Sequence, residues 1–145
     1  MKKLYTIGFT KKNAETFFGL LQQANVRTVL DIRLNNTSQL AGFAKRDDLR
    51  FFLKTLCQCD YLHVPQFAPT QTILDAFKKN KGDWREYEIS FSKLIHTRRV
   101  ETELSPNIID NACLLCSEAT PEHCHRRLVA EYLQKTLGNI EIIHL

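Results

Sequence analysis

The stretch that decides the fold is residues 112–145, ACLLCSEATPEHCHRRLVAEYLQKTLGNIEIIHL. Its apolar opening, Ala112–Cys116, predicts a buried strand. An amphipathic helix is expected next, over Pro121–Leu137, because a proline suits the first turn and Gly138 suits the end. Ile140–His144 then predicts a last strand. A strand, a helix and a strand in this order favour a parallel sheet covered by helices.

The same alternation runs through the rest of the chain. Further strands are predicted at Leu4–Ile7, Arg27–Ile32 and Tyr61–Val64, and helices after Asn13, from Asp47 or Asp48, over Thr70–Lys79 and over Trp84–Val100. We therefore expect one α/β domain over residues 1–145. It should have three layers, α/β/α, around a sheet of about five strands that is parallel apart from at most one edge.

Composition excludes several classes of protein. The chain has 145 residues, of which 43% are hydrophobic, and its formal net charge of +4 is too small to indicate nucleic-acid binding by itself. Its five cysteines are odd in number and do not form a disulfide framework. No apolar run approaches the roughly 20 residues of a membrane helix, and the first eight residues lack a signal-peptide core. We expect a cytoplasmic protein with free thiols and no membrane partner.

Residues with reactive or charged side chains follow the predicted strands. Right-handed crossovers place the carboxyl ends of parallel strands at one edge of the sheet, where ligands of α/β proteins bind. The predicted start of the last helix lies at the same edge. The candidate site residues gathered there are Gly8, Asp31, Arg33, Cys116, Glu118, Cys124, His125 and Arg126.

Several of these residues belong to a longer pattern that covers nearly the whole chain. It comprises Tyr5–Gly8, Leu30–Arg33, Leu114–Glu118 and Cys124–Arg126, together with Ser38, Phe43, Tyr61, His63, Ile143 and His144. With this pattern the chain resembles the DUF488 family, and the Cys-x-Glu…Cys-His-Arg element is its most distinctive part. The resemblance implies a compact α/β domain of prokaryotic type. It implies no activity, because the function of that family is undefined.

The function that the site residues favour is an enzyme-like pocket for a phosphate-bearing ligand, either a nucleotide or a nucleic acid. Backbone N–H groups at the helix start, with Arg33 and Arg126, would bind the anion. Glu118 and His125 would move protons, and Cys116 or Cys124 would line the pocket or attack the ligand.

Three further residues complete this candidate site. Asp31 is the alternative general base, while Gly8 and Cys124 would line the ligand site. Cys124 also lies near a helix start and several cations, which favour a thiolate. A thiolate would suit redox or sulfur transfer, and Asp31-Ile32-Arg33 at a strand end resembles the rhodanese-like sulfurtransferases. In those proteins an arginine follows the cysteine closely, whereas here the first one after Cys116 is Arg126.

Interpretations without catalysis fit the same residues. A carboxylate of Asp31 or Glu118 that pairs with Arg33 or Arg126 would form a partly buried ion pair and hold the loops together. The thiols would then only pack. Alternatively, the basic edge would bind nucleic acid or a partner protein without turnover.

A zinc site is a further alternative at the same position. Thiolate and imidazole are usual zinc ligands, and Cys116, Glu118, Cys124 and His125 supply them. The spacing Cys-x7-Cys-His is not a standard zinc motif, and adjacent residues of a helix point about 100 degrees apart. We therefore expect no metal and no cofactor. Cys113 is expected to be a buried apolar residue, because residues three apart on a strand face opposite sides.

Overall fold

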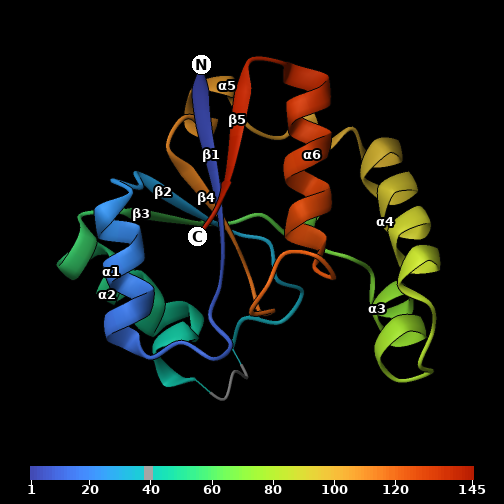
Figure 1. Cartoon of the computed structure of the whole chain (residues 1–145), viewed down its shortest axis with the longest axis horizontal. Coiled ribbons are helices and arrows are strands. Elements are labelled where there is room, and N and C mark those ends of the chain that lie inside the picture. The colour runs from blue at the N-terminus through green and yellow to red at the C-terminus, as the bar shows by residue number, and fades with distance from the viewer. Residues whose placement is uncertain (38–40) are drawn as a thin grey trace.

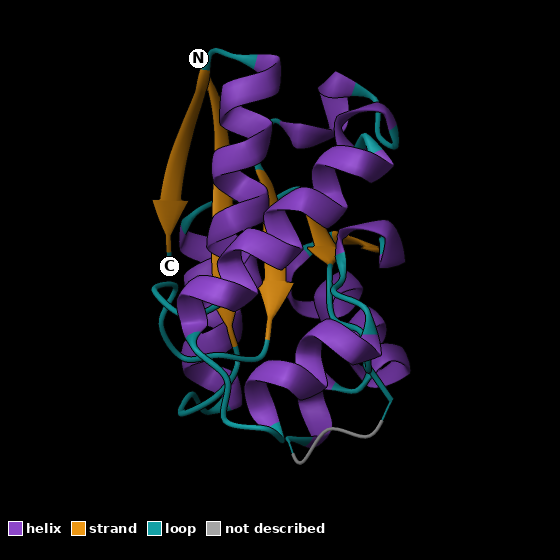
Figure 2. Ribbon diagram, turned by 90° about the vertical axis from the view of Figure 1, so that its right-hand side faces the viewer, coloured by secondary structure: helices purple, strands orange, loops and turns teal. Residues whose placement is uncertain are grey.

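A single parallel sheet organises the computed structural model, which describes residues 1–37 and 41–145 (Figure 1). Within those residues the strands are β1 (Lys2–Gly8), β2 (Thr28–Asp31), β3 (Asp60–His63), β4 (Ala112–Cys116) and β5 (Ile140–His144). Their order across the sheet is β3-β2-β4-β1-β5, and each neighbouring pair runs parallel (Figure 2). The predicted α/β fold is confirmed. Ser38, which belongs to the DUF488-like pattern, lies outside the described residues.

Helices cover both faces of the sheet and give the predicted three layers. In the described part of the chain they are α1 (Ala14–Gln23), α2 (Arg46–Cys57), α3 (Gln71–Lys78), α4 (Trp84–Arg98), α5 (Pro106–Ile109) and α6 (His125–Leu137). Helices α1 and α2 cover one face, and α4 and α6 cover the other, with α3 packed against α4 (Figure 1). Short 3-10 turns occupy Gly42–Ala44, Pro65–Phe67 and Val100–Thr102.

Capping side chains fix where two of these helices begin. The Asn13 side chain accepts a hydrogen bond from the Thr16 backbone N–H at 2.8 Å, and α1 begins at the next residue. The Thr70 hydroxyl accepts one from the Ile73 N–H at 3.2 Å at the start of α3. Both starts agree with the sequence, because polar side chains at these positions satisfy N–H groups that the first helical turn leaves open.

Strand β4 lies in the centre of the sheet and is buried throughout. Its side chains alternate between the two faces, as in any strand. Leu114 packs with α4 and α6, whereas Cys113 and Leu115 pack with α1 and α2. Cys116 therefore faces the α4–α6 side, and its thiol points away from that of Cys113, as the sequence predicts.

Helix α6 begins at His125, four residues later than the sequence predicts. Residues 121–124 form a turn in which the Cys124 N–H donates to the Pro121 carbonyl at 3.2 Å. The preceding loop is held across the end of β1, since the Thr10 N–H donates to the Ser117 carbonyl at 3.1 Å. This anchoring delays the helix. Cys124 consequently has extended backbone angles, φ −134° and ψ 138°, and caps the helix rather than belonging to it.

Two expectations about the whole chain can be compared with the structure. All five cysteines are free thiols, as predicted. Among residues 1–37 and 41–145, no helix combines the length and the apolar character that crossing a bilayer requires.

Candidate functional site

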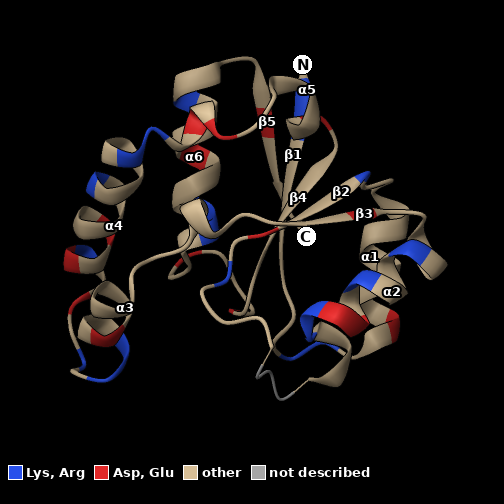
Figure 3. Ribbon diagram, turned by 180° about the vertical axis from the view of Figure 1, so that it is seen from behind, with Lys and Arg blue, Asp and Glu red and all other residues tan. Residues whose placement is uncertain are grey.

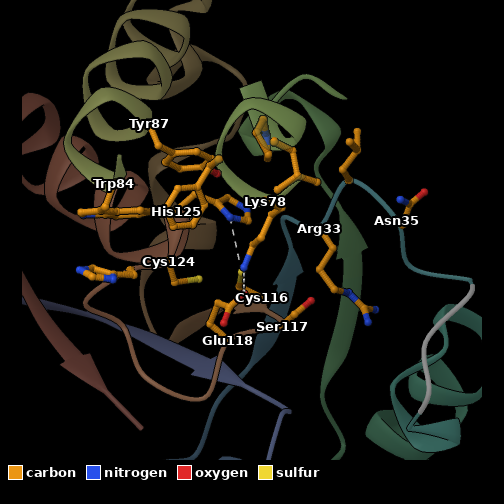
Figure 4. Close-up of a pocket in the computed structure, with 15 residues that line it drawn as sticks. Arg33, Asn35, Lys78, Trp84, Tyr87, Cys116, Ser117, Glu118, Cys124 and His125 are labelled. Carbon is orange, nitrogen blue, oxygen red and sulfur yellow. Dashed lines mark hydrogen bonds and ion pairs between the residues drawn. The ribbon is translucent and has the colours of Figure 1, made fainter. Parts of the chain in front are cut away.

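A cavity of about 260 Å³ opens at the carboxyl edge of β2 and β4, against α3, α4 and the start of α6 (Figure 4). Cys116, Cys124 and His125 lie at its inner end, and Arg33, Lys78 and Glu118 also line it. Four aromatic rings complete its wall, those of Phe77, Trp84, Tyr87 and His123. Five of the eight residues that the sequence predicts for the site therefore line the cavity, and one of these five, Glu118, lies at its rim.

The inner end of the cavity is a cluster of two thiols and an imidazole, which we call the thiol–imidazole cluster: Cys116, Cys124 and His125. Their three ligand-type atoms lie within 4.8 Å of one another, and the Cys116 Sγ is 3.4 Å from His125 Nδ1. All three residues are almost fully buried, with 4%, 2% and 8% of their surfaces exposed. Cys116 comes from the end of β4, whereas the other two come from the start of α6.

The imidazole is oriented by the backbone of the neighbouring strand. His125 Nε2 lies 2.7 Å from the carbonyl oxygen of Ile32. A carbonyl only accepts hydrogen bonds, so the proton of the neutral ring resides on Nε2. The lone pair of Nδ1 then faces Cys116, and Nδ1 bears a proton only when the ring is cationic. The side chain of Phe91 packs edge-on against the ring at 5.4 Å between centroids.

The cluster favours a thiolate at Cys116. Burial opposes its ionisation, but the hydrogen bond from Cys124 and the charge and hydrogen bond of His125 hold the pKa of Cys116 well below its usual value. Burial and the neighbouring Cys116 raise the pKa of Cys124. Burial opposes protonation of His125, yet the Cys116 thiolate raises the pKa of its imidazole. One thiolate therefore receives hydrogen bonds from two neighbours.

At Cys57, Cys59 and Cys113 the effect of burial prevails, and their pKa values are raised. Burial raises the pKa of Cys113 well above its usual value and that of Cys59 to about 12. Burial also raises the pKa of the half-buried Cys57. Reactivity that depends on the thiolate form is accordingly confined to Cys116 among these positions.

Asp31 and Arg33 form a buried ion pair beside the cluster. The Arg33 Nε and Nη2 each donate to the Asp31 carboxylate at 2.8 Å, and both residues are at most 2% exposed. The Tyr61 hydroxyl donates to the same carboxylate at 2.5 Å, and the Asn36 amide does so at 3.4 Å. We call these four residues the Asp31 clasp. Burial and the carboxylate together raise the pKa of Tyr61. The clasp ties the ends of β2 and β3 together. Arg33 Nη1 is buried and has no hydrogen-bond partner among the described residues, and the guanidinium lies over the Phe9 ring at 5.5 Å.

Arg126 and Gly8 position the loop that leads to the cluster. Arg126 is fully buried, and it donates from Nη1 to the Glu118 carbonyl at 2.5 Å and from Nε to the Thr6 hydroxyl at 3.2 Å. A Cβ atom on Gly8 would lie 1.6 Å from that same carbonyl oxygen. Only glycine permits this close approach. Neither Arg126 nor Gly8 lines the cavity.

Glu118 forms an ion pair with Lys78, a partner that the sequence analysis does not predict. Its carboxylate accepts a hydrogen bond from the Lys78 ammonium at 2.6 Å, and the two side chains are 41% and 48% exposed. The Glu118 side chain therefore lies at the rim with Lys78. The ring nitrogens of His125 face Ile32 and Cys116 instead.

Sequence reasoning missed the wall of the cavity. Trp84 stacks on Tyr87 at 4.9 Å and on His123 at 5.0 Å between ring centroids. Lys78 and Trp84 stand at the end of α3 and the start of α4, so their placement depends on how these helices pack. The available signal was the aromatic pair Trp84 and Tyr87 next to a cluster of lysines.

Comparison with known proteins assigns the chain to a family. The family model described as "Domain of unknown function DUF488" matches residues 13–133. The chain belongs to the DUF488 family. The match includes the Asp31 clasp and most of the edge that forms the cavity, whereas Gly8 and β5 lie outside it. Searches of curated proteins and of solved structures found no match. Membership of DUF488 brings no assigned activity.

Proposed function

We propose that this DUF488 protein is an enzyme whose cavity binds a small phosphate-bearing molecule of the nucleotide type. The observation that carries the proposal is the arrangement of three kinds of group in one cavity. A thiol–imidazole cluster lies at the inner end, aromatic rings form a wall, and the Lys78 ammonium stands at the rim (Figure 4). A planar base suits the aromatic wall, and a phosphate suits the cation.

A small molecule fits the cavity better than a nucleic acid does. The volume of about 260 Å³ is close to the lower end of ligand pockets, roughly 300–1,000 Å³. Lysine and arginine residues outside it are spread over α2, α4 and the turn between α3 and α4, with acidic residues between them (Figure 3). Nucleic-acid binding usually needs a continuous basic face.

Each residue of the site has a role in this proposal. Lys78 binds the phosphate, which replaces the Glu118 carboxylate as the partner of the Lys78 ammonium. The thiol–imidazole cluster acts on the ligand, with Cys116 and His125 as the catalytic residues. Arg33 lines the cavity as well, although its guanidinium is paired with Asp31. Asp31, Gly8 and Arg126 are positioning residues that hold the surrounding loops.

Fluorescence of Trp84, the single tryptophan of the chain, reports on the cavity directly. Titration with adenosine monophosphate or with other nucleoside monophosphates should change this emission in a saturable way. Adenosine should bind at least about tenfold more weakly, because it lacks the charge-assisted contact to Lys78, worth roughly 1.5–3 kcal/mol.

Two variants separate this site from general charge attraction. Lys78→Met should lose the preference for the phosphate form, whereas Lys79→Met should keep it, because Lys79 is 75% exposed and does not line the cavity. Equal affinity for nucleoside and nucleotide in the wild type, or equal loss in both variants, would contradict the proposal.

A further inference from the structure

We propose that Cys116, Cys124 and His125 bind one zinc ion, whose fourth coordination position faces the cavity. The inference deepens the proposed function, because the ion would be the part of the site that acts on the ligand. It does not depend on that function for its own test. Three protein ligands with one open position are the usual composition of a catalytic zinc site.

The spacing of the ligand atoms fits such an ion. With Zn–S near 2.3 Å, Zn–N near 2.0–2.1 Å and a tetrahedral angle, the sulfur and nitrogen atoms would be about 3.6 Å apart. The Cys116 Sγ and His125 Nδ1 are 3.4 Å apart, and the Cys124 Sγ lies within 4.8 Å of both. Small side-chain rotations would therefore bring all three atoms into coordination distance.

The histidine already has the tautomer that a metal requires. Because Nε2–H donates to the Ile32 carbonyl, the Nδ1 lone pair points into the cluster. Metal-binding histidines commonly donate their second ring N–H to a carbonyl or carboxylate in this manner. The ring is further fixed by Phe91, so its orientation needs no metal to be set.

The delayed start of α6 removes the geometric argument against a metal. That argument placed Cys124 and His125 on one helix, where their side chains would diverge. In the structure Cys124 lies before the helix, with extended backbone angles, while His125 is the first helical residue. This change of backbone conformation at Cys124 lets both side chains lie next to Cys116.

The charges at the site are consistent with this occupant. Two thiolates offset the two charges of a zinc ion, and neutral His125 adds none. Arg126, which follows His125 in the chain, is fully buried and has no ion-pair partner among the described residues. Its charge acts on Cys124 and His125 from outside the cavity and would favour an anionic ligand at the open position.

Cobalt substitution provides the test, because Co²⁺ occupies zinc sites and thiolate ligation gives it intense visible and near-ultraviolet absorption. The full-length protein, treated with a chelator and then dialysed, should bind one Co²⁺ per chain with these bands, and Zn²⁺ should displace it. Cys116→Ser, Cys124→Ser and His125→Asn should each weaken binding by more than about 100-fold, since losing even a second-shell partner costs roughly 10–100-fold. Cys57→Ala and Cys113→Ala should keep it.

A second measurement needs no variant and so does not depend on whether the variants fold. Zn²⁺ should protect the Cys116 thiolate of the wild type from iodoacetamide, and a chelator should restore its labelling. A protein that binds no Co²⁺, or whose bound Co²⁺ lacks thiolate bands, would overturn the zinc site. Nucleotide-dependent emission of Trp84 would still support the proposed function in that case. Metal binding without any change of Trp84 emission on addition of nucleotide would support the zinc site and contradict the proposed function.

Discussion

The thiol–imidazole cluster and the Asp31 clasp are neighbours at the carboxyl edge of the sheet, because His125 contacts the carbonyl of Ile32, which stands between Asp31 and Arg33 in the chain. Both bury side chains that could carry out chemistry. In the clasp the polar groups bind one another, since the Asp31 carboxylate accepts hydrogen bonds from Arg33, Tyr61 and Asn36. All three residues of the cluster line the cavity, whereas Arg33 is the one clasp residue that does so. Residue type therefore does not distinguish a functional group from a structural one, whereas access to a cavity does.

The largest effect on stability should come from breaking the clasp. Asp31→Ala leaves the Arg33 guanidinium buried without its counter-charge, which should lower the free energy of unfolding by about 3–5 kcal/mol. Urea denaturation measures this loss. The control is Asp60→Ala, because the exposed Lys54–Asp60 pair at 3.6 Å should contribute less than about 1 kcal/mol. An Asp31 variant of wild-type stability that no longer binds nucleotide would make the clasp part of the active site.

The Gly8 contact supports the loop that leads to Cys124, and a methyl group there should disturb both the fold and the thiol–imidazole cluster. Gly8→Ala puts a Cβ atom where the Glu118 carbonyl now lies, and such overpacking costs about 1–3 kcal/mol. The displaced loop should also lower Co²⁺ affinity, because residues 117–124 carry Cys124. Gly19→Ala in α1 is the matched control. Nothing lies within 4 Å of its added methyl, so stability should rise by roughly 0.5–1 kcal/mol.

Much of this comparison was accessible from the sequence. The apolar runs at Arg27–Ile32 and Ala112–Cys116 predict central strands, and parallel strands bring their ends together. An ion pair of Asp31 with Arg33 was one of the predicted alternatives. These predictions hold because strand periodicity and the right-handed crossover each depend on a single strand or on one strand–helix–strand unit.

The remaining features depend on contacts between distant segments. Glu118 pairs with Lys78, 40 residues away in the chain, and Arg126 reaches back to Thr6. The start of α6 was predicted too early, because the tie between Thr10 and Ser117 is invisible to local capping rules. Because the predicted helix included Cys124, the side chains of Cys124 and His125 were expected to diverge, and no metal site was predicted.

The pH dependence of alkylation should separate the cysteine of the cluster from the others in the metal-free protein. An ordinary thiol with a pKa near 8.5 gains about 16-fold in thiolate between pH 7 and pH 8.5. Cys116 should change far less over this range, because its pKa is lowered and its thiolate is already present. Cys57, whose pKa is raised, should accelerate throughout. Mass spectrometry of the labelled peptides measures both rates.

The same shift affects stability with a defined sign. Because the folded pKa of Cys116 lies below the unfolded value, its ionisation stabilises the fold above the unfolded pKa of about 8.5. This contribution should disappear as the pH falls through the folded pKa. Cys116→Ser should therefore flatten the dependence of unfolding free energy on pH. An unchanged profile would mean that no buried thiolate exists there.

The smallest effect on stability, and the most informative for the rim, is expected from Glu118→Gln. The Lys78–Glu118 pair is about half exposed, so its loss should change the free energy of unfolding by less than about 1 kcal/mol. Affinity for a nucleoside monophosphate should rise, because Lys78 no longer has to leave a carboxylate before it binds phosphate. Lys78→Met should lower the affinity for a nucleoside monophosphate, and its effect on stability should be equally small.

If Glu118→Gln leaves the affinity unchanged but abolishes turnover, Glu118 instead acts in proton transfer. Titration of Trp84 emission together with a turnover assay decides between the two roles.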